Sequence, residues 1–459
     1  MKQLKVHDFI LVYEHKIREL ESLCLLKMEL EKRGYSVLIK CLHAQEIYFT
    51  QNRICKPKYF AKVLGVFAGY DTYTLRICVQ NCIAFDKIIN LQWEQMISRE
   101  QEEKDSFQTP KELAKEIVHL SWGERNVERL VNVAQIDRKK VIKCGNISLD
   151  MLKEEFGAYY LSRDAICEQY GFSKEKKICT LFASFGFTNY TEEELEIVRK
   201  RMGDEKVKMV ENATIAQKEV LNWLKKAAAK YPEYIFIYRP HPGERLPTVL
   251  KEMEELLNFY VISDYSSKQW IFVSDFMFSW HSTVIVEAFL AGKTCYSLEP
   301  VSYIRSQDCV VFEGMRPIED YDTVEKILSG EVIDNCLNAE LVYQYFGDKD
   351  ERYSFEKVAD AFEKVYHEEF YSLKDIVSHY DLYTKVYKTI KERIWANPII
   401  NSIYWLYVDF FSRYDFLQKR SLSSQVYAKY KIIKETEVAS EEEIEKIQDK
   451  FSKILKGKK

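Results

Sequence analysis

The chain lacks the features that mark exported, membrane-spanning and disulfide-bonded proteins. It has no apolar run of about 18 residues, the length that a membrane-spanning helix needs. Its first residues, Met1-Lys-Gln-Leu-Lys-Val-His7, hold no apolar signal-peptide core. The 11 cysteines form no CxxC pair and have no zinc-type spacing, and several lie in apolar segments. Scattered thiols suit a reducing compartment, so we predict a cytoplasmic protein without a disulfide framework.

A basic excess is also absent, since the formal net charge is −4. This balance argues against nucleic acid as a partner. The 459 residues are 47% apolar and 30% charged, which is typical of a globular chain with two or more domains. The 31 Tyr, 26 Phe and 7 Trp residues predict large packed cores. The alternative is an aromatic surface that meets lipid headgroups or a polysaccharide.

The first part of the chain has the pattern of a doubly wound α/β domain. A strand over 8–13 is followed by a polar loop, a helix over 20–32 that ends at Gly34, and a second strand over 36–41. We predict a Rossmann-like domain over residues 1–155. Further strands are expected at 61–68, 87–91, 118–123 and 141–145.

A second α/β series begins after a polar, helical stretch around 155–176. We predict a Rossmann-like domain over 156–330, with helices at 216–230 and 282–291. Its strands are expected at 177–183, 234–238, 260–262, 273–278 and 294–298. Two such domains that face a cleft form the architecture known as GT-B.

Residues 331–459 are predicted to form a helical C-terminal region. Within it, the aromatic segment 399–416 follows a helix break at Asn397-Pro398. We expect this segment to pack back across the first domain. The alternative is an interfacial helix that makes peripheral contact with the inner membrane leaflet.

One loop with candidate binding residues is Arg239-Pro-His-Pro-Gly-Glu244, directly after a predicted strand. Ligands of open α/β sheets bind beyond the carboxyl ends of the strands. The two prolines restrict the backbone on either side of His241. Arg239 and His241 both donate hydrogen bonds and suit a phosphate. Arg239, His241, Gly243 and Glu244 are therefore candidates for donor binding, and the alternative is a rigid turn.

The second candidate loop is Ser279-Trp-His-Ser-Thr283, which again follows a strand and opens a helix. Hydroxyl groups and free N–H groups at a helix start favour an anion, although simple capping also explains them. We therefore add His281, Ser282 and Thr283 to the candidates for phosphate binding. Glu287, one helical turn later, is placed to bond a ribose hydroxyl or to form a surface salt bridge.

These two loops and the strand that follows them carry a family resemblance. The runs RPHPGE from Arg239 and HSTVIVEAFLAGK from His281 resemble bacterial surface-carbohydrate and capsule biosynthesis proteins of GT-B fold. They are also similar to elements of sialyltransferases, capsule Kdo transferases and the polyol-phosphate polymerases of teichoic acid, which use CMP- or CDP-activated donors. The resemblance implies that His241 and the Ser282–Thr283 pair hold the donor phosphate and that Glu287 holds the ribose.

The catalytic base is not given by this resemblance, because the chain has no Asp/Glu-Asp/Glu-Gly triplet. Glu14 and Glu19 lie in the loop that follows the first strand, where either can accept a proton from an acceptor hydroxyl. Their alternative role is to complement the dipole of the following helix. His15 is a weaker candidate, and His119 is explained equally well as a structural residue.

We therefore expect a metal-independent glycosyltransferase of surface polysaccharide synthesis that needs no cofactor. Its partners are a nucleotide-activated sugar donor, with CMP-sugar favoured, and a glycan or lipid-linked acceptor. His241 joins Glu14 and Glu19 as a candidate catalytic residue, because with Arg239 it would stabilise charge on the departing phosphate. The alternatives are transfer of a polyol phosphate from CDP-glycerol or CDP-ribitol, a sugar-nucleotide epimerase, and a non-catalytic binding protein that kept the fold.

Overall fold

The computed structural model describes most of the chain and divides it into two compact units. The first unit comprises residues 1–95, 104–148 and 344–453, and the second comprises 96–103, 149–343 and 454–459. The helices after residue 344 thus belong largely to the first unit. The described residues are 4–42, 58–67, 83–104, 115, 117–241, 244–253, 255–347, 352–368, 400, 403, 410 and 436–457.

The first unit is built on a six-stranded parallel sheet with the order β2-β1-β3-β4-β5-β6. Its strands are apolar runs such as Phe9–Tyr13 that are buried on both faces, as parallel sheets require. Phe9 pairs with Val37 on one side and with Val63 on the other. The strands are β1 (Lys5–Tyr13), β2 (Val37–Cys41), β3 (Tyr59–Val66), β4 (Ile83–Asn90), β5 (Val118–Ser121) and β6 (Val141–Lys143).

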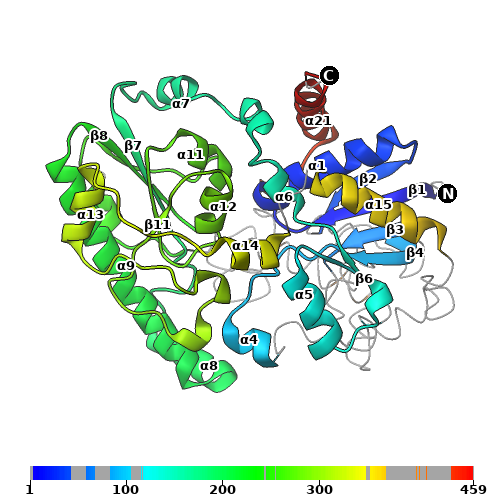
Figure 1. Cartoon of the computed structure of the whole chain (residues 1–459), viewed down its shortest axis with the longest axis horizontal. Coiled ribbons are helices and arrows are strands. Elements are labelled where there is room, and N and C mark those ends of the chain that lie inside the picture. The colour runs from blue at the N-terminus through cyan, green and yellow to red at the C-terminus, as the bar shows by residue number, and fades with distance from the viewer. Residues whose placement is uncertain are drawn as a thin grey trace. The chain divides into compact units, whose positions relative to one another are not determined.

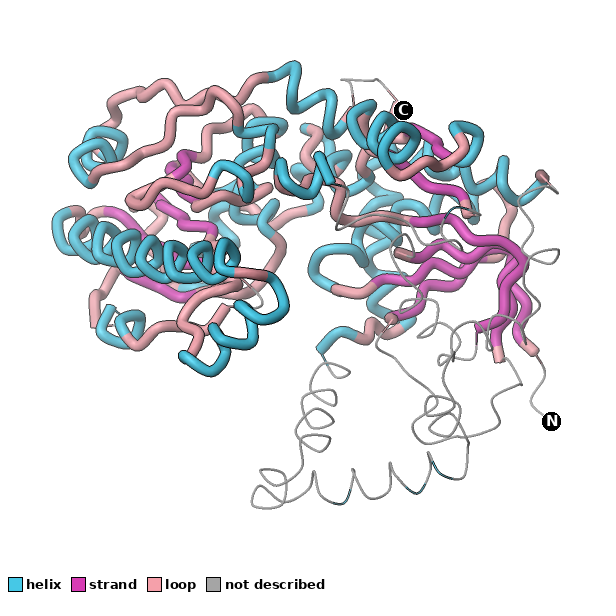
Figure 2. The backbone as a smooth tube through the Cα atoms, turned by 90° about the horizontal axis from the view of Figure 1, so that it is seen from below, coloured by secondary structure: helices cyan, strands magenta, loops and turns pink. Residues whose placement is uncertain are grey.

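Helices from distant parts of the chain pack on this sheet (Figures 1 and 2). The helix α15 lies against β3, where a Cβ built on Gly65 would come within 2.6 Å of Phe362 Cζ. A glycine is therefore needed for this close approach. The described helices that lie within the first unit include α1 (Lys16–Lys32), α5 (Glu124–Glu128), α15 (Ser354–His367) and most of α21 (Glu441–Lys456), and α6 (Ile147–Asp150) and α14 (Ala339–Phe346) span the unit boundaries.

The C-terminal helix α21 docks beside α1, which connects β1 to β2. Lys16 forms an ion pair of 2.8 Å with Glu443, and Phe451 is fully buried. Just before α21, the Tyr13 hydroxyl donates to the Glu437 carbonyl at 2.7 Å and accepts from the Ala439 N–H at 2.8 Å. The described residues from 436 to 453 are therefore an integral part of the first unit.

The second unit is built on a five-stranded parallel sheet with the order β11-β10-β7-β8-β9. One predicted strand, over 273–278, starts late, because residues up to Val273 form the helix α11 (Ser267–Val273). Strand pairing begins when the Asp275 N–H donates to the Ile178 carbonyl. The strands are β7 (Lys177–Phe182), β8 (Tyr234–Arg239), β9 (Phe259–Val261), β10 (Phe276–Ser279) and β11 (Tyr296–Ser297).

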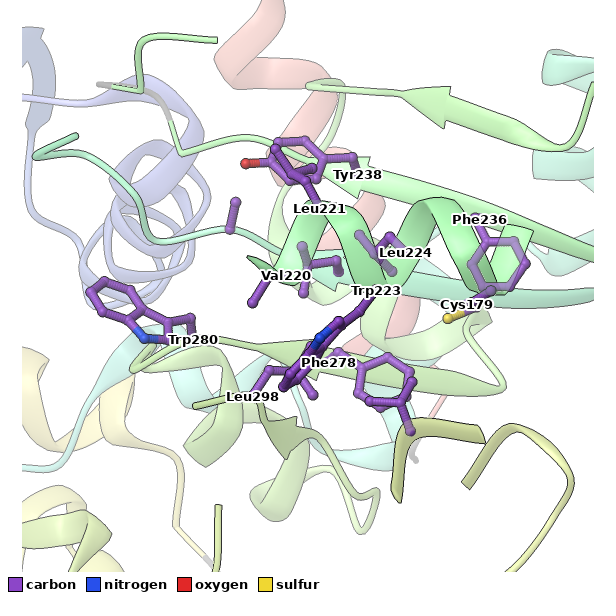
Figure 3. Packing of buried hydrophobic residues seen from close by; sticks show 14 of the residues in the cluster. Cys179, Val220, Leu221, Trp223, Leu224, Phe236, Tyr238, Phe278, Trp280 and Leu298 are labelled. Carbon is purple, nitrogen blue, oxygen red and sulfur yellow. The ribbon is translucent and has the colours of Figure 1, made fainter. Parts of the chain in front are cut away.

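The core of the second unit lies between this sheet and the long helix α9 (Asp204–Lys230) (Figure 3). Val220 and Leu224 of α9 are buried in one cluster with Phe236 and Phe278 of the sheet. Val220 and Leu224 are one helical turn apart, as expected for a helix with one apolar face. The other helices described here are α4 (Arg99–Lys104), α7 (Arg163–Tyr170), α8 (Glu192–Met202), α10 (Val249–Met253), α11, α12 (Val284–Leu290) and α13 (Tyr321–Leu328).

The predicted fold class, two parallel-sheet Rossmann-like domains with helices toward the C-terminus, is confirmed by the two strand orders. Within the described ranges, no helix is long and apolar enough to cross a membrane. The predicted aromatic helix over 399–416 falls outside the described residues apart from 400, 403 and 410.

Candidate functional site

The strand order of the second sheet identifies where a ligand can enter it. The chain starts in the middle with β7, adds β8 and β9 on one side, and then places β10 and β11 on the other. In open α/β sheets such a switch of direction leaves a crevice beyond the carboxyl ends of the strands. The loop residues 183–189, 240–241 with 244–246, and 280–283 follow β7, β8 and β10 at this edge. Both loops singled out from the sequence are thus brought to one place.

Arg239, the last residue of β8, supplies a half-buried cation at this edge. Its guanidinium donates to the Tyr265 carbonyl, while its Nε is buried and has no hydrogen-bond partner among the described residues. Burial lowers the pKa of Arg239, and the nearby carboxylates of Glu287 and Asp264 oppose this shift. A buried donor without a partner is unusual and fits an anionic ligand.

His241 follows Arg239 by two residues and is exposed. The loop after β7 approaches it so closely that a Cβ built on Gly186 would lie 3.1 Å from His241 Nδ1. The contact brings the loops after β7 and β8 together at the imidazole. Gly186 was not predictable from the sequence, because a single glycine in a loop gives no sign of the side chain that it contacts.

Glu244 holds the loop that carries His241. Its carboxylate accepts from the His241 N–H at 3.0 Å, from Gln217 Nε2 at 2.6 Å and from the Tyr238 hydroxyl. Burial raises the pKa of Glu244, and these hydrogen bonds oppose the shift. Both oxygens are engaged, so the structure places Glu244 as a support of the loop. Gly243 lies outside the described residues.

The three candidate residues in the turn between β10 and α12 differ in their exposure and contacts. Thr283 is exposed, and Ser282 Oγ accepts from the Val284 N–H at 3.3 Å. The His281 side chain, in contrast, is only 6% exposed and points into the protein. Glu287, on α12, accepts from Ser267 Oγ at 2.6 Å, and the charge of its carboxylate raises the pKa of Arg239.

The first sheet has a switch point of its own at β1, which lies between β2 and β3. Glu14 follows β1 directly and is half-buried at this edge. Glu19 is fully buried, and it accepts from the Glu14 N–H at 2.7 Å and from Arg18 Nε at 3.0 Å. Burial raises the pKa of Glu19, and Arg18 opposes the shift. Glu19 thus stabilises the start of α1, whereas Glu14 is the carboxylate that directly follows β1 at the carboxyl edge of the sheet.

The two histidines named as weaker candidates also differ in their surroundings. His15 is exposed at the start of α1, next to Glu14. His119 is buried in β5, with Nδ1 3.0 Å from Asn90 Nδ2. Across the described ranges, no group of three or more His, Cys, Asp or Glu side chains is arranged to hold a metal ion.

Comparisons with known proteins give similar structures but no related sequence. No protein-family model matches the chain, and no curated protein matches it. Similar solved structures include the S. aureus MnaA–UDP co-structure, with 12% identity, coverage of 79% of this chain and 96% of that chain, and a TM-score of 0.45.

Two further structures have comparable values. The UDP-GlcNAc 2-epimerase from Neisseria meningitidis bound to UDP-GlcNAc has 13% identity, coverage of 79% and 99%, and a TM-score of 0.43. The wall teichoic acid polymerase TagF has 12% identity, coverage of 78% and 89%, and a TM-score of 0.46. Since these TM-scores lie below 0.5, the fold rests on the strand orders of the two sheets.

Proposed function

We propose that the chain is a glycosyltransferase of surface-polysaccharide synthesis that binds a nucleotide-activated sugar, a CMP-sugar by preference, in its second unit. The observation that carries the proposal is the buried Nε of Arg239, which has no hydrogen-bond partner among the described residues and lies at the carboxyl end of β8, the strand next to β7. An anion such as a donor phosphate would accept a hydrogen bond from this Nε. The preference for cytidine rests on the resemblance of the two loops.

In this proposal four residues of the second unit contact the donor. Arg239 and His241 would contact the donor phosphate and stabilise the negative charge that develops when it leaves. Thr283, which is exposed at the start of α12, would add a hydroxyl contact. Glu287 would accept a hydrogen bond from a ribose hydroxyl beside its present partner Ser267.

The first unit would hold the acceptor and supply the base. The acceptor hydroxyl oxygen forms a bond to the anomeric carbon of the sugar, and the bond from that carbon to the phosphate oxygen breaks. The hydroxyl proton passes to Glu14, and the nucleotide leaves with the electron pair. Glu14 is preferred over Glu19, because the Glu19 carboxylate is fully buried and hydrogen-bonded to Glu14 N–H and Arg18.

A thermal-shift screen tests nucleotide binding. CMP, CDP, UDP, GDP and ADP are each added to the wild-type protein and to His241→Ala. A ligand at a hundred times its dissociation constant adds about 2.7 kcal/mol of stability. We expect CMP or CDP to raise the midpoint of the wild type, with the shift reduced in His241→Ala. A shift with UDP alone would discard the cytidine donor, and no shift with any nucleotide would contradict the enzyme proposal.

Turnover then separates the chemistries that share a cytidine donor. Release of CMP together with sugar transfer from a CMP-sugar supports the glycosyltransferase, whereas release of CMP from CDP-glycerol or CDP-ribitol indicates polyol-phosphate transfer. Interconversion of a nucleotide sugar without an acceptor would indicate an epimerase. Binding without any turnover would indicate a protein that only binds its ligand.

A further inference from the structure

The turn between β10 and α12 holds a buried imidazole between two carboxylates. His281 Nε2 lies 3.1 Å from Glu299 Oε1, and His281 Nδ1 lies 3.4 Å from Asp308 Oδ1. The three side chains are 6%, 13% and 22% exposed, in that order. Neither contact has the geometry of a hydrogen bond, so each is an ion pair when the ring is protonated. These two contacts were not predictable from local spacing, because the carboxylates lie 18 and 27 residues after His281 in the sequence.

Other aromatic rings fix the imidazole in this position. The Tyr303 ring stacks on it with centroids 3.7 Å apart. The rings of Trp280 and Phe312 make T-shaped contacts with it, with centroid distances of 5.5 Å and 6.1 Å. The titratable groups that face His281 are Glu299, Asp308 and Tyr303. Cys309 lies beside Asp308, whose Oδ1 accepts from the Cys309 N–H at 2.7 Å.

This surrounding favours the charged form of the ring. A neutral imidazole has one N–H, whereas an imidazolium has one on each nitrogen and can face a carboxylate on both sides. Burial lowers the pKa of His281, but the contacts with Asp308 and Glu299 raise it, and the net direction is upward. Deprotonation would leave two carboxylates beside an uncharged ring.

The backbone at His281 is also unusual, with φ at 41°. Side chains other than glycine rarely adopt this left-handed region, so the neighbouring contacts must hold the residue there. The next two residues are Ser282 and Thr283, and α12 then carries Glu287. The conformation of His281 therefore sets the direction in which the proposed phosphate-binding residues enter the crevice.

We propose that His281, Glu299 and Asp308 form a charge-locked turn that positions Ser282 and Thr283 for the donor phosphate. His281 is thus a positioning residue, and it acts from inside the protein. The proposal rests on the donor site proposed above. The pKa of His281 is raised in the folded protein. The attraction between the protonated ring and the carboxylates of Glu299 and Asp308 is therefore fully present below the ordinary histidine pKa of 6.5, and it is lost as the pH rises through the raised value.

The test measures CMP affinity by titration calorimetry from pH 6 to pH 9. The wild type should lose affinity above the pKa of His281, by up to about tenfold per pH unit when binding is linked to one proton. His281→Asn should bind more weakly at pH 6, with a flatter pH profile, because Asn tolerates the left-handed backbone but carries no charge. Glu299→Gln should shift the wild-type profile to lower pH.

A matched control is Glu313→Gln, since Glu313 is 52% exposed and pairs with Arg99 rather than with His281. This variant should keep the wild-type profile. Equal pH profiles for the wild type and His281→Asn would overturn the charge-locked turn and leave the donor site standing. Failure of CMP, CDP and UDP to bind the wild type at any pH would overturn the donor site, and the positioning role with it.

A proton NMR titration of the His281 ring gives a second readout that needs no ligand. The ring should titrate above 6.5 in the wild type and at lower pH in Glu299→Gln. A ring that titrates below 6.5 in the folded wild type would contradict the charged lock, whatever the nucleotide results are.

Discussion

At the residue scale, the fit between Gly186 and His241 ties the loop after β7 to the proposed donor site. We expect Gly186→Ala to displace His241, since the new Cβ would lie 3.1 Å from Nδ1. Affinity for CMP should fall by about tenfold, which corresponds to about 1.4 kcal/mol. Gly157→Ala is the matched control, because its Cβ would come no closer than 4.0 Å to Phe272. Calorimetric affinities of both variants check the prediction, and equal loss in both would contradict it.

The two carboxylates near the start of α1 make a second residue-scale prediction. Glu19→Gln should lower the free energy of unfolding by about 1–3 kcal/mol, because an amide NH2 group cannot replace the oxygen that accepts from the Glu14 N–H or from Arg18. Glu14→Gln should leave stability nearly unchanged and lower sugar transfer at least about a hundredfold, as expected for loss of a general base. Urea unfolding and turnover of a CMP-sugar separate these effects. Full activity of Glu14→Gln would exclude Glu14 as the base.

Sequence patterns at this scale located the loops but not the directions of their side chains. Arg239 and His281 both follow apolar strands, so both could be placed at the carboxyl edge of a sheet. The inward turn of His281 depends on Glu299 and Asp308, which lie in another loop. The burial of Glu19 depends likewise on the packing around α1. Such contacts between distant residues are not encoded in local spacing.

At the element scale, a buried lysine fastens α15 to the first sheet. Lys87 Nζ, in β4, donates to the carbonyls of Val365, Tyr366 and Glu368 at 2.7, 2.9 and 2.6 Å. These carbonyls belong to the last turn of α15, where backbone acceptors lack partners within the helix. The interaction therefore both ends the helix and neutralises the negative end of its dipole.

We expect Lys87→Met to lower the free energy of unfolding by about 2–3 kcal/mol, because buried carbonyls lose their donor. The control Lys364→Met changes an exposed lysine of the same helix that is 3.8 Å from Glu368, and it should cost less than about 0.5 kcal/mol. Urea denaturation followed by far-UV circular dichroism measures both. Equal stability of the two variants would show that the Lys87 contacts do not hold α15.

The positions of most strands and helices were predictable from apolar runs and helical spacing, because these signals are local. The strand predicted over 273–278 is an exception. Val273 is the last residue of α11, and the strand β10 begins only at Phe276. A short apolar run fits either a strand or a buried helix, and only the pairing of Asp275 with β7 decides where the strand begins.

At the scale of the whole molecule, the chain returns to the first unit after completing the second. A return to the first domain was predicted only for 399–416, which lies outside the described residues apart from 400, 403 and 410, whereas the apolar faces of α15 and α21 give no sign of the unit to which they belong. Phe451→Ala should lower the stability of the first unit by about 3–4 kcal/mol, since Phe451 is fully buried. CMP affinity, which depends on the second unit, should stay unchanged.

The control for Phe451→Ala is Lys446→Ala, which removes an exposed pair with Glu442 on the same helix. This pair contributes about 0.3–0.5 kcal/mol, so the variant should unfold nearly like the wild type. Unfolding followed with and without CMP distinguishes the two units. Loss of CMP binding in Phe451→Ala under native conditions would contradict a donor site contained in the second unit.

The central claim is that a nucleotide donor binds beside Arg239, and calorimetric titration of CMP tests it most directly. The titration is run on the wild type, on Arg239→Gln and on the control Arg201→Gln, which changes an exposed arginine of α8. We expect CMP to bind the wild type and the control alike, and Arg239→Gln to lose about 1.5–3 kcal/mol of binding free energy, the range for a hydrogen bond to a charged group. Equal binding by all three proteins would contradict it.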